Sequence, residues 1–157
     1  MRTAVLILEN LRSVENTGSI FRTAEGLGVK KIILVGTTPT PLDRFGRKRS
    51  DFAKVSLGSE EMLEWEYVAA KNLELTISNL QKEGFKIIAL EQTPKSKNLA
   101  TSHKPLTPFA LIVGNEVDGI SKEALELSDD IVEIPMQGKK ESLNVSVSTG
   151  IALFMLI

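Results

Sequence analysis

The sequence predicts an α/β fold, with a mostly parallel sheet and helices on both faces. Three observations support this prediction. Short apolar runs alternate along the chain with segments of helical periodicity. The runs are continuous stretches of Val, Ile and Leu, which is typical of strands that are buried on both faces. Strand and helix follow each other in turn, as parallel strands require because each pair is joined by a crossover connection.

The first half of the chain is expected to form three strands and two helices. A helix is expected over Asn16–Gly28, with Asn16 as its N-cap and Gly28 as its stop. A shorter helix is expected near Ser50–Leu57. The segment Gly36–Pro41 before it contains prolines and a glycine, which break regular structure. The expected strands are Thr3–Leu8, Lys31–Val35 and Trp65–Val68.

The second half is expected to form three more strands and two helices before the C-terminal segment. Ala70–Glu83 carries apolar residues at helical spacing and ends at Gly84. Ser121–Leu127 is expected to be a short helix that is capped by its first residue. Gln92–Pro108 is polar and rich in proline, and is therefore expected to be irregular. The expected strands are Phe85–Leu90, Phe109–Val113 and Ile131–Ile134.

The C-terminal segment, Asn144–Ile157, is expected to be a helix that is apolar nearly all round. Such a helix is too apolar to face water on any side. It must fill the core or pack against another subunit. Because the apolar run continues to the last residue, we expect an oligomer interface that involves this helix or its neighbours.

Composition favours one soluble domain over residues 1–157, because this length is sufficient for a hydrophobic core. No apolar run reaches membrane-spanning length, and no secretory signal is visible. The chain has no cysteine and a single histidine, His103, which argues against disulfides, thiolate metal sites and histidine zinc sites. We therefore expect a cytoplasmic protein without a metal.

The net charge of −1 argues mildly against a general nucleic-acid coat protein, which is usually basic. One local segment is nevertheless strongly basic, and Phe45 and Phe52 are interleaved with its cations. These cations are Arg44, Arg47, Lys48, Arg49 and Lys54. A solvated loop and a contact surface for phosphates are both compatible with this pattern.

Three polar blocks follow expected strands. The blocks are Asn16–Arg22, Gly114–Ser121, and the pair Ile134–Gly138 and Ser142–Val147. Each block alone is explained by a helix cap or a turn. Because the carboxyl ends of parallel strands meet at one edge, the last two blocks together favour one site assembled from backbone. The glycine-rich patterns of dinucleotide and NTP folds are absent, and so is a nucleophile elbow.

Three longer blocks that contain these segments, Glu9–Ala24, Leu111–Ser121 and Ile134–Val147, resemble in their order and spacing the SPOUT-class RNA methyltransferases, specifically the TrmH-like (SpoU) 2′-O-ribose branch. Gly36–Pro41, Ser56–Gly58 and Ala89–Glu91 also look like that family. The resemblance implies an α/β sheet with a C-terminal trefoil knot. It further implies S-adenosylmethionine bound in the loops of the knot, and a homodimer.

The resemblance also implies roles for individual residues. Arg22 matches the catalytic arginine, and Asn16 matches the asparagine that orients it. The other polar catalytic positions are Glu116, Ser142 and Asn144. The cofactor-binding positions are Leu90, Glu91, Gly114, Asn115, Ile134, Met136, Ser142 and Leu143. In the family, the arginine and the cofactor often come from opposite subunits. The arginine acts either as proton acceptor or as a cation that stabilises the alkoxide.

The expected function is therefore S-adenosylmethionine-dependent 2′-O-ribose methylation of RNA, with tRNA as the preferred substrate and ribosomal RNA as the alternative. The basic segment Arg44–Lys54 is then expected to contact RNA, with Phe45 or Phe52 stacking on a base. Two other classes remain open. One is a non-catalytic module that binds RNA or the cofactor. The other is a nucleotide-dependent oxidoreductase, which the missing glycine fingerprint disfavours.

Overall fold

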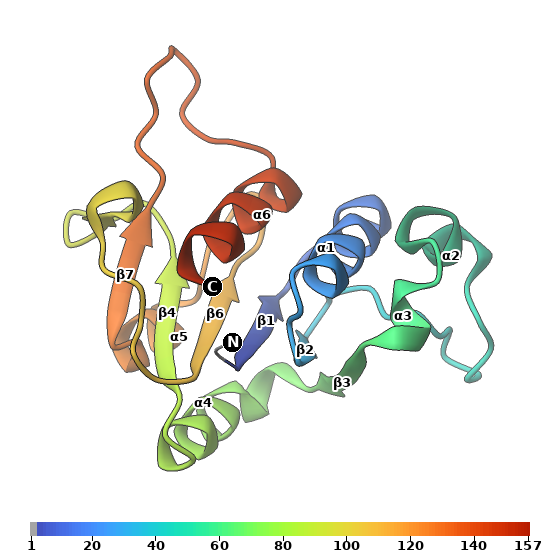
Figure 1. Cartoon of the computed structure of the whole chain (residues 1–157). Coiled ribbons are helices and arrows are strands. Elements are labelled where there is room, and N and C mark those ends of the chain that lie inside the picture. Colours follow the sequence, from blue (N-terminus) through green and yellow to red (C-terminus); the bar gives the residue numbers. More distant parts are fainter. Residues whose placement is uncertain (1–2) are drawn as a thin grey trace.

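Seven strands form one parallel sheet in the order β3-β2-β1-β6-β4-β7-β5 in the computed structural model, which describes residues 3–157 (Figure 1). Every pair of neighbouring strands in the sheet is parallel. This confirms the predicted α/β class, and the sheet is fully rather than mostly parallel. The strands are β1 Ala4–Glu9, β2 Lys31–Val35, β3 Glu64–Val68, β4 Lys86–Leu90, β5 Lys97–Asn98, β6 Phe109–Val113 and β7 Asp130–Glu133.

Helices cover both faces of this sheet. The helices are α1 Val14–Gly26, α2 Ser50–Ser56, α3 Ser59–Met62, α4 Leu73–Lys82, α5 Lys122–Leu127 and α6 Val145–Leu156, with 3₁₀ turns at η1 Ala70–Asn72 and η2 Leu99–Thr101. Helices α1, α2 and α6 lie over one face, whereas α4 and α5 lie over the other. Figure 1 shows α1 and α6 side by side above the sheet.

The core consists of two layers, one on each face of the sheet. Along β1, Leu6 and Leu8 belong to the layer under α1 and α6, and Val5 and Ile7 belong to the layer over α4. Side chains of a strand alternate between faces. A strand whose two faces are both covered must therefore be apolar at every position, which explains the uninterrupted apolar runs of the sequence.

The first helix begins earlier than predicted, and this changes the role of Asn16. Ser13 is the N-cap of α1, and its hydroxyl accepts a hydrogen bond from the Asn16 backbone N–H at 3.1 Å. The prediction of Asn16 as the cap was wrong because a serine three residues earlier occupies that position. Asn16 lies inside the first turn, and its side chain is available for other contacts. Gly28, with a φ of +72°, does end the helix as predicted.

Besides the 3₁₀ turn η2, two elements were not predicted. Strand β5 consists of two polar residues inside the proline-rich segment, and it pairs with β7 at the sheet edge. Helix α3 is a single turn that follows α2. Both are too short for an apolar period to develop, so hydrophobic patterning cannot reveal them.

Helix α6 is apolar as predicted, but one of its faces is uncovered. Ala152, Leu153 and Leu156 are buried in the core. Val147, Ile151 and Phe154 point away from the core and are exposed, and Phe154 has 72% of its surface accessible. We call these three side chains the α6 stripe. Asn144 caps the helix through its side-chain oxygen, which accepts from the Ser146 N–H at 2.8 Å. Within residues 3–157, none of the helices is both long and apolar enough to cross a bilayer.

Candidate functional site

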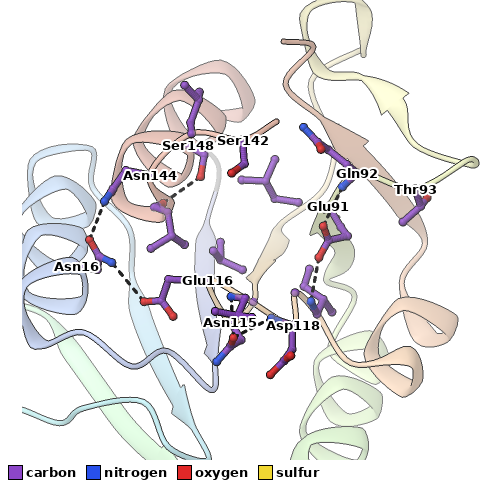
Figure 2. A pocket seen from close by; sticks show the side chains of 18 of the residues that line it. Asn16, Glu91, Gln92, Thr93, Asn115, Glu116, Asp118, Ser142, Asn144 and Ser148 are labelled. Atoms are coloured by element: carbon purple, nitrogen blue, oxygen red, sulfur yellow. Dashed lines mark hydrogen bonds between the residues drawn. The ribbon is translucent and has the colours of Figure 1, made fainter. Parts of the chain in front are cut away.

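A cavity of about 820 Å³ lies at the carboxyl ends of β4 and β6, beside the start of α6 (Figure 2). A smaller hollow of about 130 Å³ at the end of β7 shares several of its residues. In open α/β sheets, ligands bind at this edge of the sheet. The volume of the larger cavity falls in the range of small-molecule sites, which is about 300–1,000 Å³.

The cavity gathers all of the residues that the sequence assigned to a cofactor and most of those that it assigned to catalysis. The larger part is lined by Asn16, Leu90, Glu91, Gly114, Asn115, Glu116, Ser142, Leu143 and Asn144, among others. The smaller part adds Ile134 and Met136. All positions assigned to a cofactor, and the catalytic positions other than Arg22, therefore line one continuous site built from the ends of three strands, the first turn of α1 and the segment that leads into α6.

The loop after β6 requires glycine at two positions. It turns back on itself through paired backbone hydrogen bonds between Asn115 and Gly119, at 3.1 and 2.9 Å. A Cβ on Gly114 would lie 2.4 Å from the backbone carbon of Gly119 and from the Ile120 nitrogen. Gly119 has a φ of +71°, and a Cβ there would meet a Glu91 carboxylate oxygen at 2.3 Å. These two glycines make the tight loop possible.

Two carboxylates hold this loop against the sheet. Glu91 accepts a hydrogen bond from the Ile120 N–H at 2.9 Å, and Glu9 accepts from the Ser121 N–H at 3.1 Å. Glu91 also accepts from the Gln92 N–H, so its carboxylate is engaged by the backbone on both oxygens. The sequence reasoning assigned no role to Glu9. The sequence does show Glu9 as a charged residue at the end of an otherwise apolar strand, and in the structure only 4% of its surface is exposed.

A chain of polar side chains crosses the mouth of the cavity (Figure 2). The Asn144 amide donates to the Asn16 carbonyl oxygen at 3.1 Å, and the Asn16 amide donates to Glu116 at 3.2 Å. The Glu116 carboxylate also accepts from the Arg12 backbone N–H at 3.2 Å. These contacts join α1, the β6 loop and α6 across more than a hundred residues of sequence. They fix one carboxylate and two amides at the entrance.

Arg22 is not part of this arrangement. It lies on α1 six residues beyond Asn16, which is a rise of about 9 Å, and it faces in another direction around the helix. Its side chain is exposed, and it does not line the cavity. Within residues 3–157, its guanidinium makes no ion pair and its side chain makes no hydrogen bond to the protein. The structure therefore does not bring Arg22 to Asn16 within one chain.

The donor set of the cavity suits an organic ligand. The backbone N–H groups of Met136 and Leu143 find no acceptor in the part of the chain that the structure describes. Apolar side chains such as Leu90, Ile134 and Met136 adjoin them. Open amides beside an apolar wall can hold a flat heterocycle and its polar edge. Among residues 3–157, no cluster of three or more side chains is suited to holding a metal ion.

The basic segment is more internally paired than the sequence suggests. Arg47 pairs with Asp43 and Arg49 pairs with Asp51, each at 2.8 Å, and Lys48 pairs with Glu61. The backbone N–H of Arg47 donates to Asp43, and this contact helps to lower the pKa of that carboxyl. Arg44 and Lys54 are exposed, and neither forms an ion pair within residues 3–157.

Phe52 cannot stack on a base. It is fully buried and packs edge to face against Phe21, with ring centroids 5.2 Å apart. Of the two alternatives, the one that named Phe52 was wrong, because the helical period from Ser50 places Phe52 on the inner face of α2. Phe45 remains available at the tip of the loop, with 67% of its surface exposed.

Comparison with known proteins identifies the family to which this chain belongs. Residues 3–154 match the model of the SpoU rRNA methylase family. A curated relative is the 23S rRNA (guanosine-2′-O-)-methyltransferase RlmB of Photobacterium profundum. It is 34% identical over 151 residues, which cover 96% of this chain and 57% of that protein. The chain thus spans little more than half the length of this relative.

Solved structures agree with the sequence match. An AdoMet-bound rRNA methyltransferase from Sinorhizobium meliloti superposes with a TM-score of 0.84 at 26% identity, over 98% of this chain and 55% of the other. The TrmH/SpoU tRNA modifying enzyme of A. aeolicus superposes with a TM-score of 0.81 at 28% identity, over 99% of this chain and 74% of the other. The chain therefore belongs to the SpoU rRNA methylase family, the TrmH-like branch that its motifs resemble.

Proposed function

We propose that this protein is an S-adenosylmethionine-dependent RNA 2′-O-ribose methyltransferase. The observation that carries the proposal is the single cavity into which the predicted cofactor residues converge at the carboxyl edge of a parallel sheet. The similar S. meliloti protein is named as an AdoMet-bound rRNA methyltransferase, and the similar P. profundum protein as a guanosine-2′-O-methyltransferase.

The residues present fit S-adenosylmethionine. Leu90, Ile134 and Met136 offer an apolar wall for the adenine ring, and the open N–H groups of Met136 and Leu143 offer donors for its polar edge. When bound, this cofactor supplies a methyl group attached to a sulfonium. The tight β6 loop at Gly114 allows the ligand to approach the backbone closely.

The protein's own residues position the ribose and stabilise the charge that develops on it. With S-adenosylmethionine held at the apolar wall, the 2′-oxygen would take the methyl group and the sulfonium would leave as a neutral thioether. The hydroxyl proton leaves to water or to an RNA phosphate. Arg22 stabilises the developing alkoxide, because a guanidinium stays protonated at neutral pH and is therefore a poor proton acceptor. Glu116 and Asn16 hold the cavity mouth in the geometry that the ribose must enter.

A homodimer would bring Arg22 to a cavity. Arg22 is exposed and absent from the cavity of its own chain. The α6 stripe lies on the neighbouring helix, and an apolar stripe of this kind marks an interaction surface. We propose that two chains pair through the α6 stripe, so that Arg22 of one protomer faces the cavity of the other.

The Phe154→Asp variant is expected to convert the dimer into monomers, because it places a charge in the centre of an apolar contact. Methyl transfer is expected to fall by at least about 100-fold, since each cavity would lack its arginine. Analytical ultracentrifugation and a methyl-transfer assay measure the two effects. Leu75→Asp is the matched control, because Leu75 is an equally apolar exposed residue on α4, on the other side of the sheet. A dimeric, inactive Phe154→Asp protein would contradict the proposed interface.

The resemblance also implied a trefoil knot, and the composition led us to expect a cytoplasmic location; both stay predictions. For the knot, support comes from α6, which packs against β6 and against η2 of the connection between β4 and β6. Leu99 of that connection shares a core cluster with Leu153 of α6. The C-terminal helix is therefore held between a strand and a long crossover, as a threaded chain requires.

Ribosomal RNA is the substrate that we propose, in place of the tRNA expected from the sequence. The family model is described as an rRNA methylase family, and the 34% identical relative is named for 23S rRNA. Two similar structures are named for tRNA, so both RNAs belong in the test. We expect tritiated methyl groups to be transferred to 23S rRNA from cells that lack the gene, and not to tRNA from the same cells. Transfer to tRNA alone would reverse this choice.

A non-catalytic binding module is the competing function class. It would bind S-adenosylhomocysteine in calorimetry yet methylate neither ribosomal RNA nor tRNA. The oxidoreductase alternative loses its support, because the chain belongs to the SpoU family. A failure to bind nicotinamide cofactors is the corresponding expected result.

A further inference from the structure

A second hollow lies away from the cofactor cavity, between the loop after β2 and the edge strand β3. It is an open groove of about 950 Å³. Its walls carry three aromatic side chains, Phe45, Trp65 and Tyr67, and three arginines, Arg44, Arg47 and Arg49. We call it the β3 groove.

The aromatic residues reach the groove from two separate segments. Trp65 and Tyr67 are two residues apart on β3, so their side chains lie on the same face of the strand. Phe45 comes from the loop tip. Tyr67 is 53% exposed and Phe45 is 67% exposed. Two large aromatic faces in water around one hollow indicate a surface that binds a partner.

The loop tip is already ordered for this role. The Asp43 carboxylate accepts hydrogen bonds from the backbone N–H groups of Phe45 and Arg47, at 2.8 and 2.9 Å, and pairs with the Arg47 side chain. The guanidiniums of Arg44 and Arg47 lie 4.7 and 5.0 Å from the centre of the Phe45 ring. The Asp43 charge is thus matched by Arg47. Arg44 forms no ion pair within residues 3–157, which leaves a positive charge beside an aromatic face.

Hydrogen bonds connect residues that line the β3 groove with the entrance of the cofactor cavity. Thr37 and Thr38 line the groove. The Thr37 N–H donates to the Asn10 side chain at 3.1 Å, and the Leu11 N–H donates to the Thr38 hydroxyl at 3.0 Å. The next residue, Arg12, donates its backbone N–H to Glu116 at the cavity mouth. The β3 groove and the cavity mouth are therefore joined structurally through the short segment Asn10–Arg12.

We propose that the β3 groove binds unpaired bases of the RNA substrate, which stack on Tyr67 and Phe45 while Arg44 contacts phosphate. This inference rests on the proposed function. Aromatic faces next to guanidiniums are the arrangement that holds single-stranded RNA, because only an unpaired base offers its flat face. The groove thereby selects an RNA whose loop or bulge lies beside the target nucleotide.

The test uses Trp65, which is the chain's single tryptophan and therefore a specific fluorescent probe of the groove. Wild-type protein is titrated with a single-stranded RNA oligonucleotide and with the same strand annealed to its complement. We expect the single strand to quench the fluorescence and to bind about tenfold more tightly than the duplex. Tyr67→Ala should weaken single-strand binding about tenfold, whereas Tyr67→Phe should preserve it, since stacking needs only the ring.

Control variants and measurements show whether an effect on RNA binding is specific to the β3 groove. Leu106→Ala, a change at an exposed apolar residue outside the groove, should leave RNA binding unchanged. S-adenosylhomocysteine affinity and sedimentation should be the same for Tyr67→Ala and wild type. Equal binding of duplex and single strand, or full affinity in Tyr67→Ala, would overturn the proposal. A changed sedimentation of Tyr67→Ala would do so too, because it would assign the groove to a second copy of the chain. If single strands bind as expected but no RNA is methylated, the groove stands and the proposed function fails.

Discussion

The Arg22→Ala variant is expected to lose at least about 99% of methyl transfer while its fold and cofactor affinity stay intact. Removal of one group that stabilises a developing oxyanion typically reduces the rate by about 100- to 1,000-fold. Arg22 is exposed and makes no ion pair or side-chain hydrogen bond within residues 3–157, so its removal leaves no buried group without a partner. A methyl-transfer assay under saturating RNA and cofactor measures the rate.

Two further variants make this result interpretable. Arg22→Lys keeps the charge but loses the planar fork, so we expect an activity between that of wild type and Arg22→Ala. Lys82→Ala removes an exposed cation from α4, on the other side of the sheet, and should leave the rate unchanged. Equal activity of Arg22→Ala and wild type would remove this residue from the mechanism. A fall in S-adenosylhomocysteine affinity would instead assign it to cofactor binding.

The Gly114→Ala variant is expected to lower the free energy of unfolding by about 3 kcal/mol and to abolish cofactor binding. The added methyl group would lie 2.4 Å from two backbone atoms of Gly119 and Ile120, and backbone atoms cannot rotate away as a side chain does. The β6 loop must then shift, and its hydrogen bonds to Glu91 and Glu9 are strained or lost. Urea unfolding and calorimetry with S-adenosylhomocysteine measure the two effects.

Gly26→Ala provides the matched control, since it makes the same chemical change at a glycine with open space around it. Because alanine is favoured over glycine inside a helix, this variant should be as stable as wild type or slightly more stable. If Gly114→Ala unfolds and binds like wild type, the loop is not the rigid wall that the structure indicates.

The sheet was predictable because each central strand is covered on both faces. Ile32 and Leu111 are buried on one face and Ile33 and Ile112 on the other, and such uninterrupted apolar runs are typical of strands in a parallel sheet. Strand β5 and helix α3 escaped prediction because they contain too few apolar residues to show a period. The start of α1 was misjudged because Ser13 and Asn16 are both good caps, and only the geometry shows which one accepts the hydrogen bond.

The location of the cavity was predictable because polar blocks follow the ends of strands, whereas the roles of its residues came from the family resemblance. The hydrogen bonds between the residues that line the cavity could not be predicted. Glu116 accepts from Arg12 and Asn16, which are about a hundred residues away in the sequence, and no local pattern encodes that pairing. The β3 groove escaped for the same reason, because its aromatic residues lie in a loop and in a strand that meet only after folding. Phe52 was wrongly expected to stack on a base, because the basic residues around it in the sequence suggested an exposed position, whereas its side chain is buried.

The position of the transferred methyl group tests the central claim most directly. Ribosomal RNA is methylated with S-adenosyl-[methyl-³H]methionine and then hydrolysed in alkali, which cuts RNA only next to a free 2′-hydroxyl. A cavity that aligns the ribose with the cofactor predicts that the label appears in alkali-resistant dinucleotides and disappears with Arg22→Ala. Label in mononucleotides would place the methyl group on a base and contradict the account, as would a protein that binds S-adenosylhomocysteine yet labels neither ribosomal RNA nor tRNA.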